Sequence, residues 1–526
     1  MGPQKLEVII PGGQRRSIRL PEDAQNIIFA DALEAQGLPL NMRCGGRGLC
    51  RGCMVEFRDG DSSESFRACQ RKTAELPASA TNLFIPENSW RDHSLHGVSV
   101  FEIHTSADLQ PSHRIGFGLA LDIGTTTIAG ALWDFSNNHC LAHNSRPNPQ
   151  ARYGDNVVSR INFAMDRESG PADLQRSLVR DGLQPMLKAL CAQGGVNPGS
   201  IVCATASGNP TMLHTLAGES LAGLAKYPFK PTFLGQRTLQ SIEAGFKEDF
   251  ELVLLTGLGP FVGADVAVGA LASGMLEEEG PILLIDFGTN GEILLKTADG
   301  YLATATAAGP AFEGGRLACG AAARAGVISS LRRRDGQWRW TLSRSSEEEP
   351  VGISGAAYVD FLAAGANDGL LDHFGRFNRQ SLEVHERKDG EDSDWAIAVS
   401  EKTYITEADV AELLQAKAAI GGGVLTLMEK AGIEAGDLRK VLVAGGFGYH
   451  LDPAHAMRVG LLPDVPLDRI DIVGNASLGG ACLLLNDGIA DKLQPLLDQC
   501  EVVELNQEPS FEDHFTDCLL LEEMDL

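Results

Sequence analysis

Four cysteines near the start of the chain have the types and spacing of metal ligands. Five residues separate Cys44 from Cys50, two separate Cys50 from Cys53, and Cys69 follows after fifteen more. Four glycines between the first and third cysteines let the loop curl and turn its amide N–H groups toward sulfur atoms. We therefore expect the four thiolates to hold a 2Fe-2S cluster, which carries single electrons.

The cysteine spacing resembles that of 2Fe-2S ferredoxins. Five residues between the first two cysteines is similar to the vertebrate-type and putidaredoxin-like branch, whereas plant-type proteins have four. A structural zinc site is the alternative, because Cys-x2-Cys also suits tetrahedral zinc. Zinc sites usually pair two such knuckles, and this region has one.

Two short polar turns between apolar runs are candidates for binding phosphate. The first is DIGTTT at 122–127, between strand-like runs at 117–123 and 128–133. The second is DFGTNGE at 286–292, inside the apolar stretch 281–295. Two similar hairpins indicate two similar subdomains.

A third glycine-rich turn is VAGGFG at 443–448, which again follows a short apolar strand. Glycine removes side chains that would keep a flat ligand from the backbone, so an adenine and ribose could lie there. The sequence has no GxxxxGK[ST] motif, which excludes a P-loop. It has no convincing GxGxxG between a strand and a helix, which argues against a Rossmann dinucleotide site.

Together the three turns resemble the two phosphate motifs and the adenosine motif of one superfamily, which unites acetate kinase, sugar kinases, heat-shock chaperone ATPases and actin. The resemblance implies two ribonuclease-H-like subdomains around a nucleotide cleft. It implies that turn amides and threonine hydroxyls hold phosphate oxygens, while aspartates position magnesium through water. The residues expected to bind phosphate and magnesium are Asp122, Gly124, Thr125, Thr126, Thr127, Asp286, Gly288, Thr289, Asn290 and Gly291. Those expected to bind the nucleoside are Gly445, Gly446 and Gly448.

Two further carboxylates lie beside glycine-rich turns. Glu292 ends the second hairpin motif, and Glu313 lies in AGPAFEGG at 308–315. Either could orient the water that attacks a terminal phosphate, and a surface or capping role is the alternative for each. With Asp122 and Asp286 they complete the expected catalytic set.

The elements around the cysteines predict a small sheet with a helix packed across it, a β-grasp arrangement. Apolar runs and turn residues place strands at 6–10, 17–20, 54–57 and 82–85, and a helix at 26–36. The cysteine loop lies between this helix and the third strand.

A chain of 526 residues is too long for one core. We expect an α/β multidomain chain, with a β-grasp 2Fe-2S ferredoxin domain before the two ribonuclease-H-like subdomains. The expected divisions are a ferredoxin-like domain at 1–88, a linker at 89–116, ATPase subdomain I at 117–280, ATPase subdomain II at 281–505 and a C-terminal tail at 506–526.

Charge and hydropathy limit the partners. The net charge of -26 would repel nucleic acid and an anionic membrane surface, so neither is expected as a partner. The start MGPQKLEVII is unlike a signal peptide, and no later run of about 18 apolar residues lacks charges, which favours a cytoplasmic protein. Eleven cysteines in such a chain indicate reduced thiols or metal ligands.

A ferredoxin-like domain joined to an ATPase-like body resembles the reductive activators of corrinoid-dependent enzymes. The resemblance covers nearly the whole chain and includes SGNPTMLH at 207–214 and GNASLGGA at 474–481. It implies an ATP-hydrolysing iron-sulfur enzyme that returns a cobalt(II) corrinoid to cobalt(I) by transferring one electron. The implied cofactors are a 2Fe-2S cluster, ATP and Mg²⁺. The implied partners are the corrinoid protein of a methyltransferase system and an electron-donating reductase or ferredoxin, and a homodimer is compatible with both.

Three other functions remain open at this point. One is a kinase-like phosphotransferase with a redox-sensing ferredoxin domain, although no catalytic base for an acceptor hydroxyl stands out. Another is an activator like those of 2-hydroxyacyl-CoA dehydratases, which hold a 4Fe-4S cluster at a dimer interface. The third is a non-enzymatic redox scaffold that binds ATP.

Overall fold

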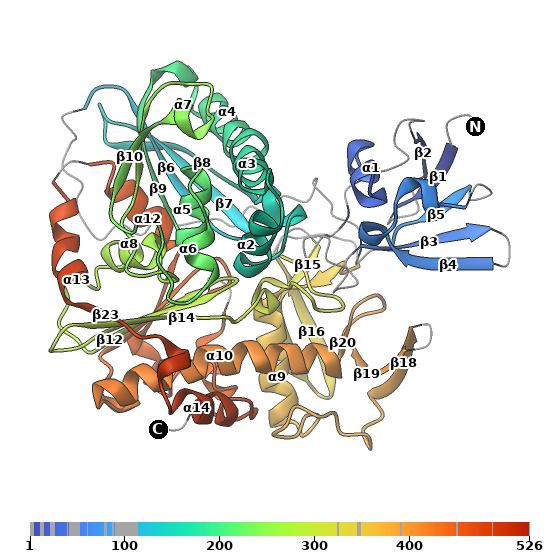
Figure 1. Ribbon diagram of the computed structural model, residues 1–526. Helices are drawn as coiled ribbons and strands as arrows, with labels where there is room; N and C mark the ends of the chain where they lie inside the picture. Colours follow the sequence, from blue (N-terminus) through green and yellow to red (C-terminus); the bar gives the residue numbers. More distant parts are fainter. Residues whose placement is uncertain are drawn as a thin grey trace.

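The protein is described by a computed structural model. It describes residues 5–10, 15–20, 27–38, 40, 53–59, 62–77, 81–86, 89, 114–322, 326–343, 349–389, 392–448, 451–486 and 488–524. A small N-terminal sheet with one helix lies beside a larger body built on two six-stranded sheets (Figure 1).

The N-terminal sheet has five strands in the order β2-β1-β5-β3-β4. They are β1 (Lys5–Ile9), β2 (Arg15–Arg19), β3 (Met54–Asp59), β4 (Ser62–Arg67) and β5 (Asn82–Phe84). Helix α1 (Phe29–Ala35) packs on this sheet through Phe29, whose ring lies 5.9 Å from that of Phe66. The sequence predicted the helix and four of the strands. It missed β4, because SSESFR has too few apolar residues to show an alternating pattern.

The first large sheet has the order β10-β11-β9-β6-β7-β8. Its strands are β6 (Phe117–Ile123), β7 (Thr127–Asp134), β8 (His139–Pro147), β9 (Ile201–Gly208), β10 (Arg237–Gln240) and β11 (Glu251–Leu254). The helices that follow these strands are α2 (Val157–Asp166), α3 (Gly170–Arg176), α4 (Gln184–Gly194), α5 (Pro210–Leu216), α6 (Ala222–Ala225), α7 (Ser241–Ala244) and α8 (Ala264–Ala272). A π-helical stretch, Ser177–Leu183, joins α3 to α4.

The second large sheet has the order β22-β21-β12-β13-β14-β23. Its strands are β12 (Ile282–Phe287), β13 (Gly291–Lys296), β14 (Tyr301–Thr306), β21 (Lys440–Ala444), β22 (Ile470–Gly474) and β23 (Cys500–Val502). Two separate three-stranded sheets lie in the same half of the chain. One has β15 (Val327–Arg334), β16 (Gln337–Leu342) and β17 (Gly352–Ile353), and the other has β18 (Val384–Asp389), β19 (Asp392–Ala398) and β20 (Tyr404–Thr406). The helices of this half are α9 (Gly355–Asn367), α10 (Glu407–Ala431), α11 (Pro453–Arg458), α12 (Ala476–Leu483), α13 (Gln494–Gln499) and α14 (Phe511–Asp517).

The two large sheets share one plan. In each, an antiparallel meander of three consecutive strands is extended on the side of its first strand by two parallel strands. Thus β6, β7, β8, β9 and β11 correspond to β12, β13, β14, β21 and β22. The two polar hairpins occupy equivalent places, at β6–β7 and at β12–β13, which confirms the prediction of two similar subdomains.

Helix α12 crosses from the second half of the chain to the first sheet. It packs against α8, β6 and β9, and Leu478 and Leu483 are buried in the same core as Leu119. The start of α12 is thereby brought to the end of β6, where the first polar hairpin begins.

Helix α10 contains three consecutive glycines that allow close packing. A Cβ at Gly421 would lie 2.8 Å from the sulfur of Cys518, and one at Gly422 would lie 3.1 Å from the backbone of Phe515 in α14. The tail therefore contains a helix, α14, that packs on α10. Among the described residues, α10 alone is long and apolar enough to cross a membrane, but 83% of its most apolar window is buried inside the protein.

Candidate functional site

A cavity of about 260 Å³ lies between the two large sheets, and both polar hairpins line it. Thirteen of the fifteen residues predicted to bind or act on a nucleotide are among its lining residues. They are Asp122, Gly124, Thr125, Thr126, Thr127, Asp286, Gly288, Thr289, Asn290, Glu292, Glu313, Gly445 and Gly446. The two that do not line it are Gly291 and Gly448. Their missing side chains instead make room for Ile420 and Val443.

The first hairpin turns sharply after β6. A Cβ at Gly124 would lie 2.5 Å from the carbonyl oxygen of Thr127, so only glycine fits this turn without a shift. Asn209, which caps α5, donates from Nδ2 to the hydroxyl of Thr125 at 3.0 Å. The turn is thus fixed by its own geometry and by a helix cap behind it.

The two hairpins meet across the cavity at their threonines. The hydroxyl oxygens of Thr126 and Thr289 are 2.6 Å apart. Both hydroxyls also lie in hydrogen-bonding distance of Glu313 Oε2, at 2.7 Å and 2.8 Å. Burial raises the pKa of Glu313, while these hydroxyls and the charge of Arg160 lower it. Three residues predicted separately from sequence therefore form one hydrogen-bonded group.

The third glycine turn lies directly against the second hairpin. Gly445 has φ +91°, and a Cβ there would lie 2.2 Å from the carbonyl oxygen of Phe287 and 2.8 Å from Oδ1 of Asp286. A side chain at this position would push the two loops apart. Gly446 and Phe447 beside it line the cavity.

Asp122 is held by residues from the second half of the chain. Its carboxylate accepts from Asn475 Nδ2 at 2.8 Å and from the hydroxyl of Ser477 at 2.7 Å. Burial raises the pKa of Asp122, and these two hydrogen bonds lower it. Both partners lie in the stretch at 474–481, which contributes to the family resemblance of the sequence, but neither was expected to bind Asp122.

Asp265 is a fifth carboxylate of the cavity that sequence reasoning missed. It lies in the first turn of α8, and burial together with the charge of Asp122 raises its pKa to about 7. An acid at the start of an otherwise apolar helix, after the glycine-rich run GLGPFVG, was the available signal.

Two further acids of the cavity, Asp286 and Glu292, also have raised pKa values. Burial, then the charges of Asp265 and Asp122, raise the pKa of Asp286 to about 8. Burial, then the charges of Asp265 and Asp286, raise the pKa of Glu292 well above its ordinary value. A divalent cation would offset the negative charge of these neighbouring carboxylates, and carboxylate and hydroxyl oxygens are ligands that Mg²⁺ accepts.

Arg160 supports the first hairpin from behind the cavity. Its side chain is fully buried, and Nη2 donates to the carbonyl oxygen of Thr125 at 2.5 Å. Burial lowers its pKa to about 9, against the charges of Asp155 and Glu313. It remains a cation at neutral pH and partly balances the acids of the cavity.

Two of the four predicted cluster cysteines lie in the described part of the N-terminal domain. Cys53 and Cys69 are both buried, at the same end of the β3–β4 pair. The backbone N–H of Ala68 donates to the carbonyl oxygen of Cys53 at 3.0 Å, which keeps the two cysteines at neighbouring backbone positions. Cys44 and Cys50 lie outside the described residues.

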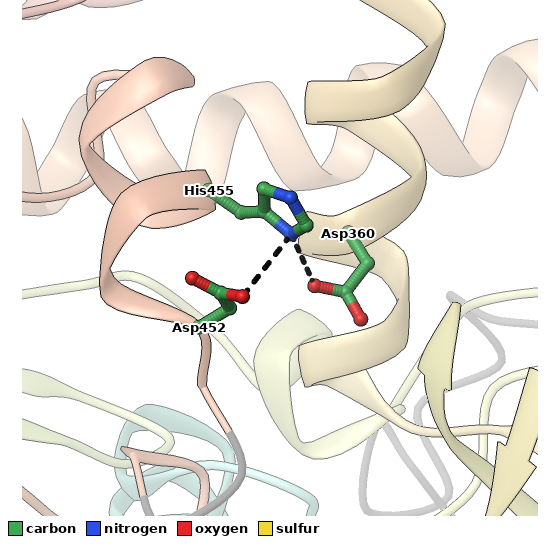
Figure 2. A group of neighbouring side chains, drawn as sticks. All are labelled: Asp360, Asp452 and His455. Atoms are coloured by element: carbon green, nitrogen blue, oxygen red, sulfur yellow. Dashed lines mark hydrogen bonds and ion pairs between the residues drawn. The ribbon is translucent and has the colours of Figure 1, made fainter. Parts of the chain in front are cut away.

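A separate group of ionisable side chains joins α9 to α11 (Figure 2). Nδ1 of His455 is 2.6 Å from Oδ1 of Asp360 and 3.9 Å from Asp452. Asp360 also accepts from the backbone N–H of Leu331 at 2.8 Å. The hydrogen bond to Asp360 and the charges of both aspartates raise the pKa of His455, against burial. The group is an ion pair that fixes α11 to α9.

The chain is similar in sequence to two known proteins and in fold to a solved structure. The chain is 27% identical over 573 aligned residues to the corrinoid activation enzyme RamQ of Eubacterium limosum, covering 93% of this chain and 95% of that protein. It is 25% identical to the Co(II) methylated amine-specific corrinoid protein reductase of Methanosarcina barkeri, covering 69% of this chain and 68% of that protein. Its fold is similar to that of a reductive activator for corrinoid, iron-sulfur protein, with a TM-score of 0.73, 24% identity and 99% of each chain covered.

Two family models account for most of the chain. Residues 117–278 match the RACo middle region, and residues 280–526 match the C-terminal domain of RACo, described as the ASKHA domain. The first match spans the sheet of the first hairpin, and the second spans the sheet of the second hairpin and the third glycine turn. The chain therefore belongs to the RACo family, with a middle region followed by the ASKHA domain of that family.

Proposed function

We propose that this chain is an ATP-dependent reductive activator that transfers one electron from a 2Fe-2S cluster to the cobalt(II) corrinoid of a partner protein, restoring cobalt(I). The observation that carries the proposal is the cavity in which two phosphate-type hairpins face each other, in a chain that also has a cysteine-bearing N-terminal domain. Three relatives with corrinoid activation or reduction in their names support the choice of acceptor.

The hairpin residues are assigned to the nucleotide. Turn amides and hydroxyls at 124–127 and 288–290 would bind phosphate oxygens, and the glycines at 445 and 446 would admit the nucleoside. Asp122, Asp286 and Asp265 would hold Mg²⁺ through its water shell. The raised pKa values of Asp265 and Asp286 fit this assignment, because a cation would relieve the repulsion between neighbouring carboxylates. Mg²⁺ would polarise the phosphate oxygens and offset the charge that develops during hydrolysis.

Glu313 and Glu292 are the candidates to position the attacking water. Glu313 already lies against the threonines of both hairpins, whereas Glu292 lies deeper, on β13 opposite Asp286 in the β12–β13 pair. A carboxylate with a raised pKa beside a phosphate site can accept a proton near neutral pH. Glu313 has the better position, because its oxygen lies between the two phosphate turns.

The N-terminal domain (residues 1–88) is assigned to a 2Fe-2S cluster held by Cys44, Cys50, Cys53 and Cys69. The buried position of Cys53 and Cys69 at one end of a strand pair fits thiolate ligands in a ferredoxin-like sheet. Such a cluster exchanges single electrons, which an external reductase or ferredoxin would supply.

The nucleotide is needed because a 2Fe-2S cluster is usually too weak a reductant for corrinoid cobalt(II). ATP can help only by changing the relative stability of two conformations of the complex. Thr126 and Thr289 lie in hairpin turns of different sheets, with their hydroxyl oxygens 2.6 Å apart, so the separation of the sheets would depend on whether a phosphate lies between them. Hydrolysis would then reset the separation.

The test is an anaerobic reduction assay. The reduced protein is mixed with a cobalt(II) corrinoid protein encoded by the same organism, and cobalt(I) absorbance is followed with and without Mg·ATP. We expect an ATP-dependent signal that Asp122→Ala abolishes with the cluster intact, while Asp299→Ala, an exposed acid on a turn outside the cavity, leaves it unchanged. ATP-dependent phosphorylation of a small acceptor without cobalt(I) would instead support the phosphotransferase.

A further inference from the structure

The N-terminal domain touches the body through an ion pair on α1. Nη1 of Arg152 lies 3.3 Å from Oε1 of Glu34, and Nη2 of the same guanidinium lies 3.4 Å from Oδ2 of Asp181. The guanidinium carbon also lies 4.7 Å from the ring centre of Tyr153. In Figure 1, α1 is the part of the N-terminal domain that faces the side of the body where α2 and α3 lie. Contacts with Asp181 and Tyr153 thus fix the Arg152 side chain on the body, where its guanidinium also pairs with Glu34 of the N-terminal domain.

A second acid on the same helix faces the same basic surface. Asp31 precedes Glu34 by three residues, so the two side chains share one face of α1. Burial raises the pKa of Asp31, and the charges of Arg167 and Arg152 both lower it. The contact is therefore charge-complementary, with two acids of α1 against two arginines of the body.

The segment that carries Arg152 is bonded directly to the first phosphate-type hairpin. Asn148 donates from Nδ2 to the carbonyl oxygen of Gly124 at 2.9 Å, and from its backbone N–H to that of Thr126 at 2.7 Å. The side-chain oxygen of Asn148 accepts from the N–H of Gln150, which lies two residues before Arg152 in the 3-10 turn Pro149–Arg152.

Arg160 makes the same connection from α2. Its guanidinium donates to the carbonyl oxygen of Thr125 at 2.5 Å and to Oε1 of Gln150 at 3.2 Å, and Nε donates to the carbonyl oxygen of Gly154 at 3.0 Å. The side chains of Arg160 and Gln150 are fully buried. Movement of the hairpin backbone is therefore transmitted to the turn that ends at Arg152.

The opposite side of the cavity also contacts this segment. Asp155 pairs with Arg316 at 3.6 Å, and Arg316 follows the turn that holds Glu313. We call residues 148–160 the docking segment, because they join both sides of the cavity to the N-terminal domain.

We propose that the docking segment is a nucleotide-responsive binding surface for the acidic face of α1, so that occupancy of the cavity changes how tightly the N-terminal domain binds the body. The inference rests on the proposed function, because it takes the cavity to bind a nucleotide. It adds an interface between the two parts of this chain and names the residues that form it.

The weakness of the Arg152–Glu34 contact suits an N-terminal domain that dissociates from the body and binds it again. The side chains of Arg152 and Glu34 are 24% and 27% exposed, so solvent weakens their attraction. Loss of a partly exposed ion pair changes an equilibrium by about two- to fivefold. The attraction across the contact falls as Arg152 moves away from Glu34, so a movement of the hairpin that displaces Arg152 would weaken the contact. The N-terminal domain can then carry an electron to a partner.

The test is hydrogen–deuterium exchange of the full-length protein with and without a non-hydrolysable ATP analogue and Mg²⁺. Peptides over α1 report docking, and peptides over the β6–β7 hairpin report binding to the cavity. Arg152→Ala removes the contact, and Arg180→Ala is the matched control, because Arg180 pairs with Asp181 but is solvent-exposed. The double variant Arg152→Glu, Glu34→Arg again places opposite charges across the contact, with the acid now on the body and the base on α1.

In the wild-type protein and Arg180→Ala, we expect the analogue to protect the hairpin and to change α1 exchange by about two- to fivefold. In Arg152→Ala, the hairpin should still be protected, but α1 should exchange fast and not respond. The double variant should recover part of the response. A protected hairpin with an unresponsive α1 in the wild type would overturn the docking proposal alone. An unprotected hairpin would overturn the nucleotide site and the docking proposal with it.

Discussion

Substitution of Gly445 by alanine tests whether the third glycine turn and the second hairpin must touch. Two costs follow from the structure. The backbone at 445 has φ +91°, which costs an alanine about 1–2 kcal/mol. The new Cβ would lie 2.2 Å from the carbonyl oxygen of Phe287, and overpacking of this kind costs about 1–3 kcal/mol. The total is about 2–5 kcal/mol, unless the loops separate.

Separation of the loops relieves the overlap but damages the site. The gap must widen by about 1 Å, because non-bonded carbon and oxygen atoms rarely approach closer than about 3.2 Å. That shift moves Asp286, whose Oδ1 would lie 2.8 Å from the same Cβ, away from the nucleoside position. If the shift withholds about 1.4 kcal/mol from binding, the affinity for Mg·ATP falls about tenfold.

Calorimetric titration with a non-hydrolysable Mg·ATP analogue measures the affinity, and urea unfolding measures the stability. Gly436→Ala is the matched control, because an added Cβ at this exposed glycine would meet no atom within 4 Å. Wild-type affinity and stability in Gly445→Ala would refute the steric argument. A loss of stability at unchanged affinity would refute the assignment of this turn to the nucleoside.

Three further changes have definite expected outcomes. Asp265→Asn should slow phosphate release by about a hundredfold, since it removes an acid that faces the proposed Mg²⁺; an unchanged turnover number would exclude this role. Cys69→Ser should lower the iron content and the visible absorbance of the purified protein, whereas Cys191→Ser, a buried cysteine of the body, should alter neither. The pKa of His455 is raised in the folded state, so its pairing with Asp360 stabilises the fold fully below the unfolded pKa and is lost as pH rises through the folded pKa. His455→Gln should therefore lower the free energy of unfolding in urea more at pH 6 than at pH 8.5, by about 1 kcal/mol or less, and an equal loss at both values would contradict this sign.

The hairpins were predictable because their signals are local. An apolar strand, a glycine-bearing polar turn and a second apolar strand occupy fewer than twenty residues, and antiparallel neighbours need no distant partner. The equal plan of the two sheets follows from two such hairpins. The 25-residue helix α10 has a signal of the same local kind, because apolar residues recur along it with helical spacing.

Contacts between distant segments were not predictable in the same way. Asp122 is bonded to Asn475 and Ser477, more than 350 residues away, because α12 returns to the first sheet. No local pattern shows which sheet a short apolar helix will cover. Arg160 looks like an ordinary surface residue of an amphipathic helix in the sequence, and its burial depends on carbonyl groups supplied by loops at 125 and 154.

If the cavity binds Mg·ATP as proposed, the contacts among Thr126, Thr289 and Glu313 imply that the binding energy would come largely from the cation. Both threonine hydroxyls already have a carboxylate acceptor, so a phosphate oxygen in its place exchanges one anionic acceptor for another. Such an exchange contributes little net free energy. Burial and the charges of neighbouring acids raise the pKa values of Asp265 and Asp286, by contrast, and a Mg²⁺ ion that entered with the phosphates would remove that cost. A bound phosphate would free Glu313 from the threonines, so the carboxylate of the proposed base would become available to water only with a nucleotide in the cavity. The contact between the two hairpins would thus also keep Glu313 occupied while the cavity holds no nucleotide.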